Sequence, residues 1–188
     1  MDLIYLRHGK TDWNDRGLLQ GRTDIPLNEE GLAQAKAAGE ILKNYTFDAV
    51  YCSPLSRAVQ TLAMAYPTDS FVTDARLAEW SFGVLEGKCV SEEYFRSFWS
   101  FGQEPLEDGE SIEDVVARVF DFYNEIKAKH PDGRVLVVSH GGVSGAMHAA
   151  VCGISPDENL RKYCLPNAVP VLFRAGSEPV LLTEDFYD

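Results

Sequence analysis

The alternation of strand-like and helix-like segments along this sequence predicts an α/β domain. We expect three layers (α/β/α) around a mixed, mainly parallel central sheet, with a helical lid insertion. Short apolar runs, typical of buried strands, alternate with longer amphipathic stretches. No internal repeat or linker divides the 188 residues, so we expect a single domain over residues 1–188. One irregular, aromatic-rich stretch at about residues 90–108 interrupts the pattern, and we assign the lid to it.

The composition is that of an ordinary globular protein, with 45% hydrophobic and 24% charged residues. The net charge of −12 argues against nucleic acid and membranes as partners. The four cysteines lie far apart without a C-x-x-C pair, so zinc ribbons and disulfide scaffolds are not expected. The N-terminus lacks the basic and apolar regions of a signal peptide, and no apolar run approaches the ~18–20 residues of a membrane span. We therefore expect a cytoplasmic protein.

The chain begins with a strand, a loop and a helix. The apolar run 3–6 predicts a buried strand that stops at Arg7-His8-Gly9, and a polar loop follows it. Residues 28–44 predict a helix, because Asn28 is a good N-cap and small or apolar side chains repeat along one face.

The next segments predict two more strands with a helix between them. A strand is expected at 48–52, and Ser53-Pro54 directly after it is a strong helix start. That helix should run to about residue 66, and residues 71–73 predict a short edge strand.

After the irregular stretch, the C-terminal part again alternates between helices and strands. Residues 111–129 keep the i, i+3, i+4 spacing of an amphipathic helix, and 134–139 has the pattern of a central strand. A helix from Gly141 to about residue 151 follows, and the last two strands are expected at 169–173 and 180–183.

Three of these strands end just before side chains that carry or can accept positive charge. Arg7 and His8 follow the first strand, Arg57 follows the second, and His140 follows the strand 134–139. In open α/β sheets, ligands bind beyond the carboxyl ends of the strands. The four side chains are therefore expected to surround one pocket.

Glycines and helix starts beside these residues point to a phosphoryl ligand. Gly9 and Gly141-Gly142 follow the two histidines and allow a ligand to approach the backbone closely. Helices that begin near Pro54 and Gly141 would direct free N–H groups at an anion. The guanidinium of Arg57, in the first turn of one of them, matches phosphate oxygens in pairs.

Four stretches of the chain carry a family resemblance. They are Leu6-Arg7-His8-Gly9-Lys10-Thr11-Asp12-Trp13-Asn14, Ser53-Pro54-Leu55-Ser56-Arg57-Ala58-Val59-Gln60-Thr61, Leu77-Ala78-Glu79 with Gly83 and Glu86-Gly87, and Val138-Ser139-His140-Gly141-Gly142. In this order they resemble the motifs of the histidine phosphatase (phosphoglycerate mutase-like) superfamily, and the resemblance runs from residue 3 to about residue 167. Lys10 departs from the acidic or amide residue common at its position, and either adds positive potential at the pocket mouth or is only solvated.

The resemblance implies that a histidine accepts the phosphoryl group and passes it to water. His8 would attack phosphorus, while Glu79 would protonate the leaving oxygen and then activate water. The phosphoryl oxygens would be held by Arg7, Arg57 and His140, with Asn14 as a neutral donor. Arg7 and Arg57 would also lower the pKa of His8 in the empty site. No metal and no cofactor is implied, and the sequence contains no D-x-D or H-x-H pair.

The implied activity is that of a metal-independent histidine acid-type phosphatase, a hydrolase of phosphoric monoesters acting on a small phosphorylated metabolite. Cofactor-dependent mutases of the family carry a basic stretch after the glutamate, whereas residues 80–87 supply no cation here. Arg22 lies in a segment that borders the pocket in relatives. Together with Asn14 and Gly141 it is a candidate for substrate binding.

The lid at about residues 90–108 is expected to select the substrate. Its aromatic side chains either cover an apolar or ring-bearing leaving group or pack the insertion onto the domain, and its acidic residues argue against highly anionic substrates. Three other functions stay open: mutase-type phosphoryl transfer, a non-catalytic phosphate-binding regulator, and a metal-dependent hydrolase with His8 and His140 as ligands. His130 and His148 are expected to be structural.

Overall fold

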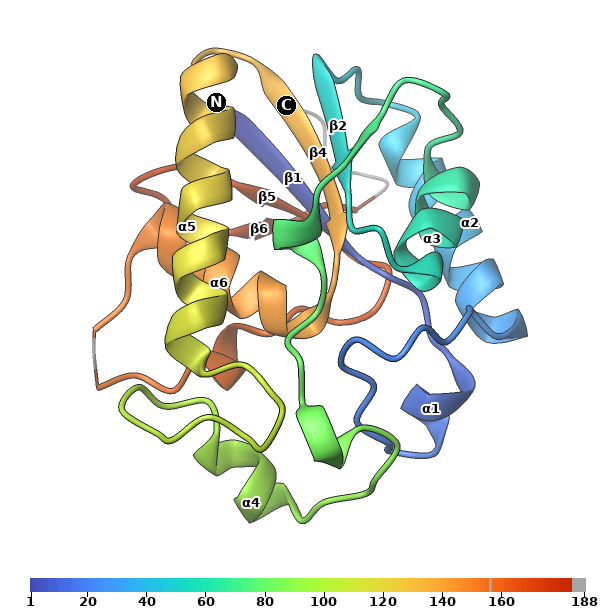
Figure 1. The fold of residues 1–188 in the computed structure, drawn as a ribbon. Helices are drawn as coiled ribbons and strands as arrows, with labels where there is room; N and C mark the ends of the chain where they lie inside the picture. Colours follow the sequence, from blue (N-terminus) through green and yellow to red (C-terminus); the bar gives the residue numbers. More distant parts are fainter. Residues whose placement is uncertain (156, 184–188) are drawn as a thin grey trace.

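A computed structural model describes residues 1–155 and 157–183, and its centre is a six-stranded sheet with the strand order β3-β2-β4-β1-β5-β6 (Figure 1). The strands are β1 (Asp2–Arg7), β2 (Ala49–Cys52), β3 (Val72–Thr73), β4 (Arg134–Ser139), β5 (Pro170–Phe173) and β6 (Val180–Leu181). The first four are mutually parallel, β5 pairs with β1 in the antiparallel direction, and β6 pairs with β5 in the same way. The prediction of a mixed, mainly parallel sheet is confirmed.

Helices cover both faces of this sheet, as Figure 1 shows. The helices α2 (Glu29–Leu42) and α3 (Ser56–Ala65) pack on one face, and α5 (Ile112–Lys129) and α6 (Gly141–Cys152) pack on the other. The alternation of side chains along β4 serves both layers. Val137 belongs to the core beneath α5 and α6, whereas its neighbours Leu136 and Val138 belong to the core beneath α2 and α3.

Two of these helices begin at the residues that the sequence indicates. The Asn28 side chain accepts a hydrogen bond from the Gly31 N–H at the start of α2. Ser111 caps α5 in a reciprocal capping box with Asp114. Such caps satisfy N–H groups that have no partner within the helix, which is why the sequence alone identified both starts.

The start of α3 was predicted wrongly at Ser53-Pro54. The helix begins at Ser56 after the N-cap residue Leu55, which makes no side-chain cap. The Ser53 hydroxyl is instead within hydrogen-bond distance of the His140 ring, and the Asp24 carboxylate accepts from the Ser56 N–H at 2.8 Å. A carboxylate from a distant loop thus takes the place of the local cap.

The polar loop after β1 also differs from the prediction, because it contains the short helix α1 (Asp12–Asp15). Its capping box joins Thr11 and Asn14. The lid contains a second short helix, α4 (Glu92–Ser97). Three single 3-10 turns complete the described elements: η1 (Ala75–Leu77), η2 (Gly83–Leu85) and η3 (Leu160–Tyr163).

The lid lies beyond the end of the sheet toward which β1 and β4 run (Figure 1). In that view α1 and α4 both lie at this end, on either side of the segment that precedes α4. Across residues 1–155 and 157–183, no helix combines the length and apolar character needed to cross a membrane.

Candidate active site

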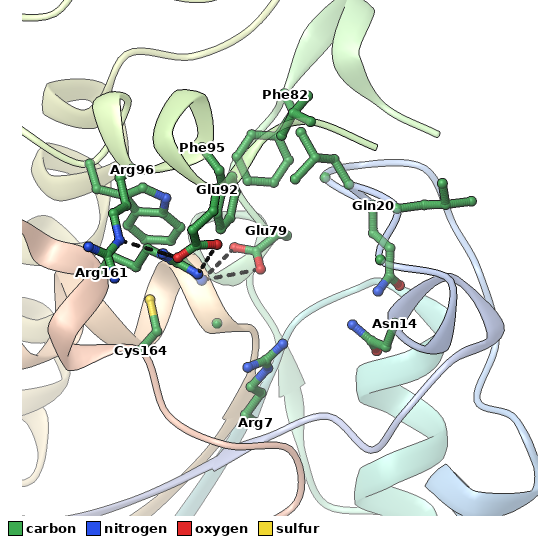
Figure 2. Close-up of a pocket in the computed structure, with 18 of the residues that line it drawn as sticks. Arg7, Asn14, Gln20, Glu79, Phe82, Glu92, Phe95, Arg96, Arg161 and Cys164 are labelled. Carbon is green, nitrogen blue, oxygen red and sulfur yellow. Dashed lines mark hydrogen bonds and ion pairs between the residues drawn. The ribbon is translucent and has the colours of Figure 1, made fainter. Parts of the chain in front are cut away.

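A large pocket, with a cavity volume of about 1010 Å³, opens at the carboxyl ends of the parallel strands (Figure 2). Six of the predicted site residues line it: Arg7, His8, Asn14, Arg57, Glu79 and Gly141. The other two, Arg22 and His140, lie next to residues of this group but do not line the cavity. The pocket therefore gathers side chains that are as far apart in sequence as residues 7 and 141.

His8 is fixed by the backbone around it. Its N–H continues the pairing of β1 with β4 by donating to the Ser139 carbonyl at 2.9 Å. Its ring Nδ1 lies 2.7 Å from the Gly9 carbonyl oxygen. A carbonyl can only accept, so Nδ1 carries the proton and Nε2 keeps a free lone pair. Gly9 is required here, since a Cβ at this position would lie 2.3 Å from the Gly31 carbonyl oxygen of α2.

The two arginines are held by backbone carbonyls rather than by carboxylates. Arg7 donates to the Leu165 carbonyl at 2.7 Å, and Arg57 donates to the Gly21 and Thr23 carbonyls at 2.7 and 2.9 Å. Neither arginine forms an ion pair with any residue that the structure describes, and the Nε of each is buried without a hydrogen-bond partner. Both therefore keep a full positive charge beside the pocket, and each leaves its Nε–H without a protein acceptor.

His140 is completely buried beside His8, with the two ring centroids 5.2 Å apart. The Tyr5 hydroxyl holds its backbone, donating to the His140 carbonyl at 2.7 Å and accepting from its N–H at 3.1 Å. The ring Nε2 is 2.7 Å from the Ser53 Oγ. That oxygen also accepts from the Leu55 N–H, so its own proton can be donated to Nε2. The ring proton then lies on Nδ1, which is buried without a partner.

Burial and neighbouring charge act on both histidines in the same direction. Burial, followed by the charges of Arg7 and Arg57, lowers the pKa of His8 well below its usual range. The predicted direction of this shift is confirmed. Burial, then Arg57 and His8, lowers the pKa of His140 in the same way. Both rings are therefore neutral when no anion is bound, which leaves His8 able to act as a nucleophile.

Glu79 turns its carboxylate toward the first turn of α6. Its Oε1 accepts from the Trp80 N–H at 2.9 Å and from the Gly142 N–H at 3.1 Å. A Cβ at position 142 would lie 2.6 Å from the same oxygen, so a larger residue there would require the Glu79 carboxylate to shift. One of the N–H groups expected to face an anion at this helix start is thus engaged by Glu79.

Arg22 hydrogen-bonds the main chain of Glu79. Its Nε donates to the Glu79 main-chain carbonyl at 3.1 Å, and its Nη2 pairs with Glu110 at 3.0 Å. Arg118 donates to the same carbonyl at 3.3 Å and also pairs with Glu110. The carboxylate of Glu86 accepts from the Arg22 N–H at 2.9 Å. The guanidinium of Arg22 is therefore occupied by protein groups.

Three residues around this site, Ser53, Arg118 and Glu110, were not anticipated from the sequence. Ser53 was interpreted as a helix cap, although its position at the end of β2 places it at the same sheet edge as His140. That shared edge is the signal that could have identified it. Arg118 and Glu110 lie outside every motif, and no local pattern marks them.

Lys10, His148 and His130 contact other parts of the protein and lie outside the pocket lining. Lys10 pairs with Glu30 at 2.8 Å and Asp15 at 3.4 Å, and does not line the pocket. His148 stacks on Tyr163 with centroids 3.8 Å apart. His130 ends α5 and lies 3.2 Å from the Tyr51 hydroxyl. None of the three belongs to the pocket.

The lid aromatic side chains divide between the core and the pocket wall, and Trp99 belongs to both. Phe98 and Trp99 are buried and join the core beneath α5 and α6. Phe95 and Trp99 also line the pocket, whereas Tyr94 is exposed. Within the described part of the chain, no group of three or more His, Cys, Asp or Glu side chains is placed to hold a metal ion.

Chemically, the inner end of the pocket presents one nucleophilic lone pair, two unpaired guanidinium donors and one carboxylate. A dianion with three oxygens, such as a phosphoryl group, fits such a set of donors.

Comparison with known proteins agrees with this chemistry. Residues 3–182 match the model of the histidine phosphatase superfamily (branch 1). A 2,3-bisphosphoglycerate-dependent phosphoglycerate mutase of Brucella canis is 31% identical over 201 residues, covering 97% of this chain and 96% of the relative.

Solved structures of phosphatases are similar as well. A phosphoserine phosphatase from Entamoeba histolytica, in complex with 3-phosphoglyceric acid, has a TM-score of 0.81 at 26% identity, covering 97% of this chain and 95% of that one. An α-ribazole phosphatase from Shigella flexneri has a TM-score of 0.78 at 25% identity, with coverages of 92% and 89%. Relatives named as mutases and as phosphatases thus share this fold.

Proposed function

The chain belongs to the histidine phosphatase superfamily, and from this premise we propose that it hydrolyses the phosphomonoester of a small phosphorylated metabolite through a phosphohistidine. The observation that supports this most directly is the state of His8. Its Nδ1 proton is held by Gly9, so that the Nε2 lone pair is free in a pocket lined by Arg7 and Arg57.

The first step transfers the phosphoryl group to the enzyme. The Nε2 lone pair of His8 attacks phosphorus while the bond from phosphorus to the leaving oxygen breaks. The carboxylic acid form of Glu79 donates its proton to that oxygen, so an alcohol leaves. The Nε–H donors of Arg7 and Arg57 are free for the phosphoryl oxygens, on which negative charge must be stabilised in the transition state.

The second step returns the enzyme to its starting state. The carboxylate of Glu79 takes a proton from water, the water oxygen attacks phosphorus, and the nitrogen–phosphorus bond breaks with its electron pair returning to Nε2. Nδ1 of His140 and the amide of Asn14 are proposed as further donors to the phosphoryl oxygens. Both donors are neutral groups, so they would hydrogen-bond the phosphoryl oxygens without adding charge to the site.

Hydrolysis is favoured over mutase activity by the segment after Glu79. A mutase must retain an organic acceptor and exclude water, and residues 80–87, the segment that is basic in cofactor-dependent mutases of the family, contribute no cation to the pocket. Mutase-type transfer is the second candidate, because the relative from Brucella canis carries that name. The cytoplasmic location stays a prediction.

One experiment separates these candidates. Purified protein is incubated with a panel of phosphorylated metabolites, with and without EDTA, and released phosphate is measured. We expect release that EDTA does not reduce. In parallel, 3-phosphoglycerate with a trace of 2,3-bisphosphoglycerate is assayed for 2-phosphoglycerate. Isomerisation faster than phosphate release would assign the protein to the mutases, and loss of activity in EDTA would favour a metal-dependent hydrolase. Phosphate binding without turnover would favour a regulator.

A further inference from the structure

The pocket has a second, outer group of cations that the phosphoryl-transfer steps do not use. It consists of Arg161 and Lys162 from η3 and Arg96 from α4, and all three line the cavity. Figure 2 shows Arg96 and Arg161 on the lid side of the pocket, across from Asn14 and Gln20. We call these three residues the outer cationic cluster.

The lining of the cavity is positive although the chain is strongly acidic. Five arginine or lysine side chains line it against two carboxylates, in a chain with 17 basic and 29 acidic residues. Two of the five, Arg7 and Arg57, belong to the phosphoryl end. Within the outer cationic cluster, Arg96 and Arg161 share the second lining carboxylate, that of Glu92, whereas Lys162 pairs with Glu158, which does not line the cavity. Such an excess of positive charge favours a ligand with a negative group at each end.

Arg161 is the least exposed member of the cluster. Both of its terminal nitrogens donate to the Glu92 carboxylate, with Nη2 2.9 Å from Oε2. Its guanidinium also lies 4.9 Å from the centre of the Phe95 ring. Its side chain is 29% exposed, against 69% for Arg96 and 52% for Lys162. A planar fork held in this way is prepared to bind a carboxylate with two parallel hydrogen bonds.

Glu92 is a partner that a ligand can replace. Its side chain is 60% exposed, and it lies in the first turn of the six-residue helix α4. Exposed ion pairs contribute little net stability, because water solvates both charges well. A substrate carboxylate can therefore take the place of Glu92 on Arg161 at small cost. The rings of Phe82, Phe95 and Trp99 line the same cavity and suit an apolar body in the same ligand.

We propose that Arg161 is a specificity-determining residue that binds a carboxylate on the leaving group of the substrate, and that Glu92 occupies this position when no substrate is bound. The inference rests on the proposed function, since it concerns the leaving group of the same ester. The substrate class is then a phosphomonoester with an apolar body and a single carboxylate at its far end. The acidic lid residues are compatible with one such charge, because Arg161 and Arg96 already pair with the nearest of them, Glu92.

Binding to a variant without turnover tests this directly. In His8→Ala protein, calorimetry compares ω-carboxyalkyl phosphates of increasing chain length with their primary amides, which have the same size but no charge. For at least one chain length, we expect the carboxylate to bind about tenfold more tightly than the amide. Adding Arg161→Gln should reduce that ratio to within about twofold, and adding Glu92→Gln should increase it, because Arg161 loses its internal partner.

Matched controls isolate the effect of Arg161. Lys36→Gln removes the same charge from an exposed position on α2, and Glu93→Gln removes an exposed carboxylate next to Glu92. Both should leave the ratio unchanged. Equal affinity for inorganic phosphate with and without Arg161→Gln shows that the phosphoryl end is intact. A ratio near one at every chain length, or one that Arg161→Gln leaves unaltered, would overturn the proposal. Release of phosphate from phenyl phosphate by the wild-type protein, which needs no carboxylate, tests the proposed function separately.

Discussion

The two ends of the pocket are built in different ways. At the inner end, His8, Arg7 and Arg57 are buried or partly buried, and the main-chain carbonyls of the loop residues Gly9, Leu165 and Gly21 accept hydrogen bonds from them. At the outer end, Arg161 and Glu92 are held by each other, and Arg161 is partly buried whereas Glu92 is exposed. Buried side chains with main-chain hydrogen bonds have few other rotamers to adopt, whereas exposed side chains change rotamer within picoseconds to nanoseconds. The side chains proposed for phosphoryl transfer are therefore held more rigidly than the side chains proposed to bind the leaving group.

The largest expected effect comes from removing the nucleophile at the rigid end. In His8→Ala, phosphate release and phosphoenzyme labelling should both be abolished, because no other free imidazole lone pair lines the described pocket. Circular dichroism should show an unchanged fold, since the side chain lies in a pocket rather than in either apolar core. His130→Gln, at the end of α5, is the control and should retain activity. Full activity of His8→Ala would refute the covalent mechanism.

The next effect concerns a charge at the same end. Arg57→Ala should lower kcat/KM by about 30- to 1000-fold, corresponding to ~2–4 kcal/mol for the loss of one preorganised donor to the transition state. Steady-state kinetics with an aryl phosphate measures this. Arg76→Ala removes an arginine that pairs with Asp74 and Asp121 instead of lining the pocket, and it is the matched control. A loss of less than threefold in Arg57→Ala would mean that the inner end is less preorganised than its hydrogen bonds indicate.

Glu79→Gln should separate substrates by their leaving groups. The amide retains a hydrogen-bonding group but has no proton to donate, so esters with alkoxide-like leaving groups should lose most activity. An aryl phosphate needs little protonation in the first step and should lose less there. Its phosphohistidine should then accumulate, because the second step lacks its base. Stopped-flow measurement should show a burst of phenol followed by slow turnover.

Equal losses for both kinds of ester, without a trapped intermediate, would exclude Glu79 from proton transfer. Glu86 is a poor substitute, because its carboxylate accepts hydrogen bonds from the N–H groups of Arg22 and Thr23 and does not line the pocket. Glu92, the other carboxylate in the described lining, would be tested next.

The sequence predicted the inner end much better than the outer one. Arg7, His8 and His140 follow strands whose apolar patterns are unmistakable, and the carboxyl ends of parallel strands meet at one edge of a sheet. Local periodicity and this one rule of sheet topology were enough to predict that the three side chains lie close together. The same reasoning placed α2 and α5, whose caps are local, but not the start of α3, which Asp24 caps from a distant loop.

Partners chosen by tertiary packing could not be predicted. The contact of Arg22 with Glu110 joins residues that are 88 positions apart, and that of Arg161 with Glu92 joins residues 69 positions apart. No periodicity relates such residues, and an arginine on a loop has many possible partners of similar energy. The function of a side chain at the outer end therefore becomes visible only in three dimensions.

A smaller effect should appear in the pH dependence of stability. Burial lowers the pKa of His8 and of His140 well below 6.5 in the folded protein, while the unfolded chain has ordinary histidine values near 6.5. Between these values the unfolded state binds more protons, so the free energy of unfolding should fall as the pH drops below about 6.5. Between pH 7 and 5.5, each histidine should contribute to this fall. Urea unfolding at both pH values measures this.

The control for this prediction is a variant with one titrating ring fewer. His8→Gln should lose less of its free energy of unfolding than the wild-type protein over the same pH interval. Identical pH slopes for the two proteins would show that the imidazole of His8 is protonated as easily in the fold as in the unfolded chain. His8 would then not be ready as a nucleophile in the empty pocket.

The smallest expected effect tests whether the two ends act independently. The centre of the Phe95 ring lies 5.6 Å from the centre of the Trp99 ring and 4.9 Å from the Arg161 guanidinium carbon. Phe95 lines the pocket, whereas its neighbour Tyr94 is exposed and does not line it. Phe95→Ala should therefore raise KM for phenyl phosphate several-fold, because an apolar wall of the leaving-group site is lost. Its kcat should stay within about twofold of the wild-type value, since His8 keeps its main-chain partners. Tyr94→Ala should change neither constant by more than about twofold. If Phe95→Ala instead lowers kcat as strongly as it raises KM, the lid takes part in positioning the reacting groups. The two ends of the pocket would then not act independently.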